Sequence, residues 1–173
     1  MSDRADLVSA APAPLARASD ASLARSEATH EYLVFEIGRD RMALPLASVK
    51  EILKLAPITP VPRAQHDVLG ILSVRGRITT VLDLRRRLGL AEGAPSRSSR
   101  ILLVDRQDEV VGLRVDAVTE VLRLRTSEIE PADLIGAGLS EHVAGLGRPR
   151  SASSDGGEAE VVVLLDPVAL LRR

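Results

Sequence analysis

The side chains that most often carry catalytic or metal chemistry are few and scattered in this chain. Its three histidines, His30, His66 and His142, stand alone, without a second histidine or a carboxylate at a metal-binding spacing. Cysteine is absent, which excludes disulfides and thiolate metal sites. No Gly-rich phosphate loop is found, because the Gly-Leu-Gly-Arg segment at 145–148 lacks the required Lys and Ser or Thr. The sequence therefore predicts no catalytic residue, no metal site and no cofactor.

Two aspartates have the position of helix caps rather than of catalytic acids. Asp83 ends an apolar run, and Asp166 is followed by Pro167, a residue favoured at the first position of a helix. The carboxylate of such a residue accepts a hydrogen bond from a backbone N–H of the first turn. We therefore predict structural roles for Asp83 and Asp166, with a short helix after each, the first ending at Gly89.

One candidate for the place where function lies is the segment Ser73–Arg77, which only the first half of the sequence carries in full. Arg75 and Gly76 separate two apolar runs, Val68–Val74 and Ile78–Leu82, in a pattern typical of a β-hairpin. A planar guanidinium at a hairpin tip can bond bidentately to a carboxylate, or donate to a carbonyl, on a partner. A solvated turn arginine without a partner is the alternative.

The elements that must position this turn are repeated along the chain. Leu33–Phe35 and Val49–Leu53 recur about 69 residues later as Leu102–Val104 and Val118–Leu122. The repetition continues toward the C-terminus, where a Ser/Gly-rich segment at 148–159 lengthens the second copy and is predicted to be a flexible insert. Two similar β-rich halves predict two packed subdomains with a groove between them.

Composition sets the class of protein. The net charge is −1, which offers no field for nucleic acid or an anionic membrane. The longest apolar run, Val161–Leu165, is far too short to span a bilayer. With only Tyr32 and Phe35 as aromatics, the core must consist of Val, Leu and Ile, whose β-branched members favour strands. These features favour a soluble cytoplasmic protein without membrane insertion or nucleic-acid partners.

Residues 1–30 are predicted to be a disordered tail, because they are rich in Ala, Ser, Arg and Asp and poor in large apolar residues. The tail is either a tether or docking peptide or a passive extension. Residues 31–173 form one domain. Its strands are expected at Tyr32–Ile37, Met42–Leu46, Val68–Val74, Ile78–Leu82, Ile101–Val104, Val110–Val115, Val118–Leu124 and Val161–Leu165.

Two positions carry more specific expectations. Pro45 predicts an edge strand, because proline cannot donate to a strand ladder. Ser48–Leu53 is either a short helix or a strand. Ser48 and Glu51 have the spacing of a capping box, which favours the helix.

The motifs together resemble the CheW family of chemotaxis coupling proteins over residues 31–171. The segments that carry the resemblance are Glu31–Phe35, Val49–Ile52, Leu69–Gly76, Val81–Arg85 and Val111–Leu122. The resemblance implies a mainly β fold of two SH3-like, five-stranded barrels, intertwined and packed on a shared hydrophobic core, with short helices. It also implies a non-catalytic adaptor that joins the cytoplasmic tips of methyl-accepting chemoreceptors to the regulatory domain of the histidine kinase CheA at membrane-associated arrays.

Residue roles follow from the same resemblance. It places the receptor-contacting arginine at Arg75, beside Gly76, and assigns the receptor groove or its support to Val49, Ile101 and Val121. Glu51 matches an acidic position linked to kinase or partner binding, while its alternative is the capping role. Gly112 is expected to permit a close backbone approach within a strand.

Two other functions remain open from the sequence. The chain can be a related module that binds a kinase or another regulator without touching receptors. It can also be a small-molecule-binding or catalytic β-barrel.

Overall fold

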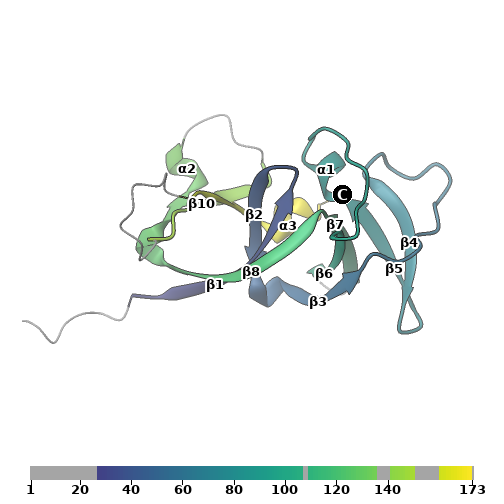
Figure 1. The fold of residues 1–173 in the computed structure, drawn as a ribbon, viewed down its shortest axis with the longest axis horizontal. Coiled ribbons are helices and arrows are strands. Elements are labelled where there is room, and N and C mark those ends of the chain that lie inside the picture. The colour runs from purple at the N-terminus through teal and green to yellow at the C-terminus, as the bar shows by residue number, and fades with distance from the viewer. Residues whose placement is uncertain (1–26, 107–108, 136–140, 151–159, 173) are drawn as a thin grey trace, which may run out of the picture.

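The computed structural model describes residues 27–106, 109–135, 141–150 and 160–172, and two β-sheets dominate it (Figure 1). The first sheet has five strands in the spatial order β3-β6-β7-β5-β4. The second has six, in the order β8-β1-β2-β11-β10-β9. Most of the expected tail and insert, residues 1–26 and 151–159, lies outside the described residues. Strand pairing begins at Thr29, so β1 starts before the expected boundary at residue 30.

The strands lie close to where the apolar runs predict them. Those of the first sheet are β3 (Val49–Lys54), β4 (Val68–Val74), β5 (Arg77–Asp83), β6 (Arg100–Arg106) and β7 (Glu109–Val115). Those of the second are β1 (Thr29–Ile37), β2 (Asp40–Pro45), β8 (Ala117–Arg125), β9 (Ile129–Pro131), β10 (Val143–Gly147) and β11 (Val162–Leu165). The second sheet exceeds the expected five strands because β9 pairs with β10 over three residues. At the equivalent place, the first sheet has only a bridge between Thr59 and Ile71.

The two halves of the sequence exchange their first hairpins. The β1–β2 hairpin pairs with β8 and β11 of the second half, while the β6–β7 hairpin pairs with β3 and β5 of the first half. Each sheet therefore combines strands from both copies of the repeat. The duplication predicted two subdomains, but neither half of the chain forms one by itself, and intertwining describes the arrangement correctly.

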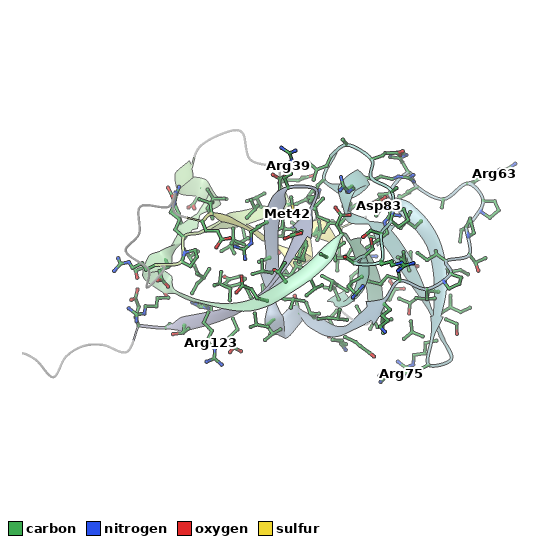
Figure 2. All side chains as sticks on the ribbon, in the orientation of Figure 1. Arg39, Met42, Arg63, Arg75, Asp83 and Arg123 are labelled. Atoms are coloured by element: carbon green, nitrogen blue, oxygen red, sulfur yellow. The ribbon has the colours of Figure 1, made fainter. Side chains whose placement is uncertain are left out.

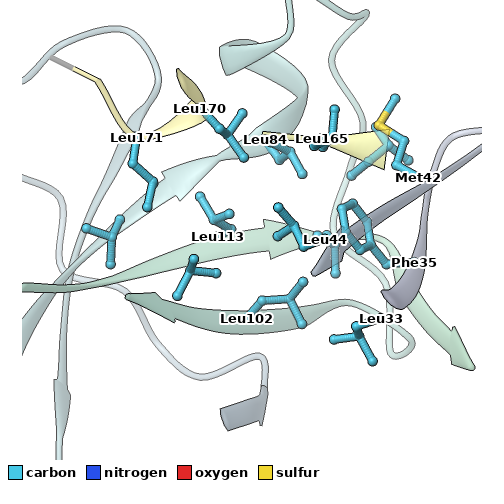
Figure 3. Close-up of a cluster of buried hydrophobic side chains, with 14 residues drawn as sticks. Leu33, Phe35, Met42, Leu44, Leu84, Leu102, Leu113, Leu165, Leu170 and Leu171 are labelled. Atoms are coloured by element: carbon cyan, nitrogen blue, oxygen red, sulfur yellow. The ribbon is translucent and has the colours of Figure 1, made fainter. Parts of the chain in front are cut away.

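One hydrophobic core joins the two sheets. Its largest cluster is drawn in Figure 3 and combines Leu33, Phe35 and Leu44 from β1 and β2 with Leu102 and Leu113 from β6 and β7. Each of these side chains is at most 3% exposed. Burial of a leucine side chain contributes about 1.5–3 kcal/mol, so this aliphatic cluster compensates for the near absence of aromatic residues. The shared core expected for the fold is confirmed.

Short helices follow three of the strands, β5, β9 and β11. They are α1 (Leu84–Arg87), α2 (Ala132–Ile135) and α3 (Pro167–Leu170), with single 3₁₀ turns η2 (Leu46–Ser48) and η3 (Thr126–Glu128). Asp83 and Asp166 cap α1 and α3, accepting hydrogen bonds from the backbone N–H groups of Arg85 and Val168 at 3.0 and 2.8 Å. Both predicted caps are confirmed. None of the helices within the described ranges is long and apolar enough to cross a bilayer.

Two local expectations are corrected. Pro45 does not mark an edge strand, because β2 lies between β1 and β11. It is tolerated because it ends β2, beyond Met42 and Ala43, the residues that pair with β11. The open alternative at Ser48–Leu53 is resolved as strand β3 from Val49 on. Ser48 ends the 3₁₀ turn η2, and its hydroxyl donates to the carbonyl of Pro45 at 2.7 Å rather than capping a helix.

Candidate partner-binding site

The β4–β5 hairpin presents Arg75 to solvent. Val74 pairs with Arg77, so Arg75 and Gly76 form a two-residue turn, with φ angles of 50° and 80°. Positive φ at both positions is the signature of a type I′ turn, whose twist matches that of the strands. Gly76 adopts this conformation without strain. For Arg75, which has a Cβ atom, the same left-handed conformation costs roughly 1 kcal/mol. Figure 2 shows Arg75 at the free end of the hairpin, where its side chain is 79% exposed.

Arg75 pairs with Glu51 of β3. The Nη2 atom of Arg75 lies 2.9 Å from Oε1 of Glu51, whose side chain is 33% exposed. β3 and β4 are the opposite edges of the five-stranded sheet, so the pair connects the sheet's two ends. A pair this exposed contributes about 0–1 kcal/mol to stability. The guanidinium therefore keeps donors that a partner can use at little cost to the fold.

This contact changes the expected role of Glu51. The capping role is wrong, because Glu51 lies within a strand and its carboxylate accepts from Arg75. The family resemblance assigned Glu51 to kinase or partner binding and Arg75 to receptor binding, yet the structure places both side chains in one surface cluster. We call Arg75, Gly76 and Glu51 the hairpin site.

The apolar candidates divide into exposed and buried positions. Val121 lies on β8 of the second sheet and is 48% exposed, while Val49 begins β3 and packs half-buried against the main core. Ile101 is fully buried, packed with Val81 and Leu103. Val121 is therefore accessible to a partner, whereas Ile101 can act only as support beneath the surface.

Gly112 makes room for that buried support. A Cβ atom at Gly112 would lie 2.8 Å from Cγ2 of Ile101 and 3.3 Å from Cγ2 of Val81. The close approach predicted at this strand glycine is present, but neighbouring side chains make it rather than a neighbouring backbone. A side chain here would displace Ile101 or Val81 inside the first sheet.

Sequence reasoning missed Ile52. This β3 residue is 44% exposed and adjoins Glu51. The signal lay in the repeat, because an offset of 69 residues pairs Ile52 with Val121. Both are apolar residues on edge strands, each of which has one neighbouring strand in its sheet.

Asp83 does more than cap a helix. It is 2% exposed, and its Oδ2 accepts a hydrogen bond from Nη2 of Arg114 at 2.6 Å. Arg86 lies 3.6 Å from the same oxygen. The buried carboxylate is therefore held by two guanidinium groups as well as by the helix N-terminus, which makes it part of the scaffold.

Asp116 is a second scaffold carboxylate, at the junction of β7 and β8. Its Oδ2 accepts from the backbone N–H of Gly38 at 2.6 Å, and Arg85 pairs with the same side chain. Burial alone would raise the pKa of Asp116, but the hydrogen bonds from Arg85 and Gly38 and the charges of Arg85 and Arg114 lower it below its usual value. These bonds tie the β1–β2 turn to α1, so Asp116 joins the two sheets.

The candidate site consists of exposed hydrogen-bond donors, and the scaffold carboxylates are paired with arginines. Among the described residues, no group of three or more His, Asp or Glu side chains could hold a metal ion. The hairpin site offers exposed donors, while Asp83 and Asp116 are engaged by arginines.

Comparison with known proteins gives a consistent family. Residues 31–173 match the CheW-like domain. A chemotaxis protein CheW of Rhizobium meliloti is 31% identical over 66% of this chain and 74% of its own length. One of Helicobacter pylori is 30% identical over 61% of this chain and 64% of its own length, just under two thirds of that relative. The crystal structure of the scaffolding protein TtCheW from Thermoanaerobacter tengcongensis superposes with a TM-score of 0.72 and 26% identity, covering 83% of this chain and 92% of that one.

Proposed function

Because this chain belongs to the CheW-like domain family, we propose that it is a non-catalytic chemosensory adaptor. It couples the cytoplasmic tips of chemoreceptors to the regulatory domain of a CheA-type histidine kinase. Its place of action is then the cytoplasmic face of a membrane-associated receptor array. The relatives are named chemotaxis proteins, and the structural neighbour is named a scaffolding protein, which supports this role.

The observation that carries the proposal is the strained, exposed arginine of the hairpin site. Glycine or asparagine suits the left-handed conformation of residue 75 better than arginine does. A position with backbone strain and a weak surface ion pair gains little stability from its side chain. Arg63 shares the positive φ, but Arg75 alone of the two stands at a hairpin tip next to a surface carboxylate, where its guanidinium donors can reach a carboxylate or carbonyl on a receptor helix.

Ile52 and Val121 supply the apolar component of the proposed surfaces. A receptor helix presents apolar residues along one face, and a groove beside exposed aliphatic side chains accommodates such a face. The receptor then contacts the hairpin site and neighbouring β3 residues. The kinase regulatory domain occupies a separate surface of the scaffold.

The contact between Glu51 and Arg75 also favours a second candidate. If the two residues serve one surface, the protein can be a single-partner CheW-like module that binds a kinase or another regulator without receptors. The two candidates differ in whether a receptor fragment and a kinase domain bind at the same time.

Size-exclusion chromatography of the protein with both partners separates these candidates. A ternary complex with a receptor signalling fragment and the kinase regulatory domain is expected for the adaptor. Competition between the two ligands supports the single-partner module. Failure of either ligand to bind the wild-type chain contradicts the adaptor role.

The role of the hairpin site is tested by Arg75→Glu with a matched control. Arg63 is also an exposed arginine with positive φ, 61°, and it lies outside the hairpin (Figure 2). We expect Arg75→Glu to weaken receptor binding at least tenfold in a pull-down titration, while Arg63→Glu leaves it unchanged. Equal effects of the two variants would remove Arg75 from the site.

A further inference from the structure

A recess lies on the first sheet along β5, whose first residue, Arg77, follows the β4–β5 turn. Its volume is about 390 Å³, and it is bordered by β5, by the start of β7 and by the two residues that follow α3. Sites for small organic ligands have volumes of about 300–1,000 Å³. The recess is therefore large enough for a small molecule.

Positive charge dominates its wall. Four arginines and two carboxylates line it: Arg77, Arg87, Arg106, Arg172, Asp67 and Glu109. Arg87 is engaged with Asp67 at 2.8 Å, so this pair neutralises itself. Arg106 lies 3.8 Å from Glu109, a long ion pair that leaves most of its donors available. The lining has an excess of two positive charges, although the whole protein has a net charge of −1.

Several donors at the wall have no acceptor within the described part of the chain. The guanidinium groups of Arg77 and Arg172 make neither a hydrogen bond nor an ion pair there. The hydroxyl of Thr79 likewise has no hydrogen-bond partner among the described residues, although Thr79 is only 5% exposed. These donors are therefore available to an acceptor atom that enters the recess.

The remaining wall is aliphatic. Val68, Leu82, Val110 and Leu171 line the recess beside the arginines. A ligand that fills it needs an apolar body next to its charged group. Fully hydrated inorganic ions would leave this surface uncovered.

We propose that this recess binds a small organic anion, whose phosphate or carboxylate oxygens accept from Arg77, Arg172 and Thr79 while its apolar body covers the aliphatic wall. Arginine suits both groups, because its planar fork matches their oxygen atoms. The proposal is independent of the adaptor function, since none of these residues belongs to the hairpin site.

Isothermal titration calorimetry on the full chain at constant ionic strength tests the proposal. Phenyl phosphate and benzoate are the anionic probes, and benzyl alcohol is the neutral probe of similar shape. We expect at least one anion to bind at least tenfold more tightly than benzyl alcohol. The tighter anion identifies the natural class as a phosphate ester or a carboxylate. If neither anion binds more tightly than benzyl alcohol, the proposal is overturned.

Variants locate the binding. Arg77→Gln removes an exposed charge, and Thr79→Val removes the Thr79 hydroxyl at nearly constant shape. Each should weaken the anion roughly tenfold, whereas Arg63→Gln, outside the recess, should not change it. Because Arg77 is exposed, Arg77→Gln should stay folded and can test the site even if Thr79→Val unfolds. Equal weakening by Arg63→Gln and Arg77→Gln would show nonspecific charge attraction and overturn the site.

Discussion

Two equivalent glutamates show how the halves of the molecule have diverged. Glu51 on β3 and Glu120 on β8 occupy the same place in the repeat. Glu51 pairs with Arg75 on a protruding turn, whereas Glu120 pairs with Arg41 of β2, which is 19% exposed and also binds Glu160. The arginine partner is therefore exposed in one half and mostly covered in the other, although Glu120 itself, at 51%, is more exposed than Glu51, at 33%. The position of the arginine determines which role the glutamate has.

The two capping aspartates differ in the same way. Asp83 and Asp166 accept from the helix backbone with the same geometry, but Asp83 is also buried against Arg114. The two halves also differ at the residue before β4 and before β10, which is Asp67 in the first half and His142 in the second. Asp67 and His142 each accept from the backbone of their capping aspartate, yet only Asp67 binds Arg87. The first half therefore concentrates charge where the second half has an ordinary cap.

The largest effect on stability should come from removing the carboxylates of the two capping aspartates. Asp83→Ala should lower the free energy of unfolding by about 3 kcal/mol or more, because it leaves the partly buried Arg114 without its carboxylate as well as removing a cap. Asp166→Ala, which removes only a cap, should cost ~1 kcal/mol. Urea denaturation of both variants measures the difference. Equal costs would show that the Arg114 pair adds nothing.

The junctions between the halves offer a second test. Asp116 follows β7, while the equivalent residue after β2 is Ala47, which has no charge. Loss of the charged hydrogen bonds in Asp116→Asn should cost about 2 kcal/mol at neutral pH. Ala47→Asp provides the matched control, since it adds a carboxylate at a position without an equivalent of Arg85. This variant should not stabilise the protein.

The pH dependence of Asp116 has a defined sign. Its folded pKa lies below the usual value of 3.8, so the stabilisation is fully present above that value and is lost as pH falls through the lower folded pKa. The difference in unfolding free energy between wild type and Asp116→Asn should therefore shrink in acid. Urea melts at pH 7 and below pH 4 measure it. A difference that grows in acid would contradict the assignment.

The two arginine partners should differ more modestly. Arg41→Ala should cost about 1 kcal/mol, since Arg41 is mostly covered and holds two carboxylates, Glu120 and Glu160. Arg75→Ala should cost less than about 0.5 kcal/mol, because the lost ion pair is exposed and alanine keeps the Cβ atom that strains the turn. Thermal melts compare them directly. A larger loss for Arg75→Ala would assign the hairpin site to stability rather than to recognition.

The smallest effect is expected at the N-terminus. Deletion of residues 1–26 should leave the melting temperature unchanged, because it retains the contacts of Glu27 and Ala28 with η3, the turn that follows β8. There, Glu27 accepts from the backbone N–H of Ser127 at 2.7 Å, and the carbonyl of Ala28 accepts from Thr126 at 3.0 Å. Deletion of residues 1–28 removes both bonds and should lower stability slightly. A large loss with the shorter deletion would show that the tail packs on the domain.

Local signals predicted much of this fold. The turn at Arg75-Gly76, the caps at Asp83 and Asp166 and most strand positions depend on neighbouring residues, which the sequence displays directly. The exchange of hairpins could not be predicted in this way. β1 and β6 carry nearly the same apolar pattern, so each fits either sheet, and only packing across the whole molecule selects its partner.

The sequence identified the central residue of the candidate site but not the contacts that this residue makes. The family resemblance and the turn pattern both identified Arg75, whereas the pairing of Glu51 depends on curvature that brings opposite sheet edges together. Pro45 was misassigned because only its end of β2 lacks a partner in β11, while the strand itself lies between two others. Burial of Ile101 likewise depends on Gly112 of the neighbouring strand, which no local pattern at Ile101 reveals.

The exchange of hairpins also governs how the chain is made and folded. The β1–β2 hairpin leaves the ribosome before either of its sheet neighbours, β8 and β11, has been synthesised. A lone hairpin is at best marginally stable in water, so its apolar face must wait for residues at the far end of the chain. Pairing over such sequence separations slows folding. The first sheet can close only after synthesis reaches Val115 and the second only after Leu165, so a chain interrupted midway contains neither complete sheet.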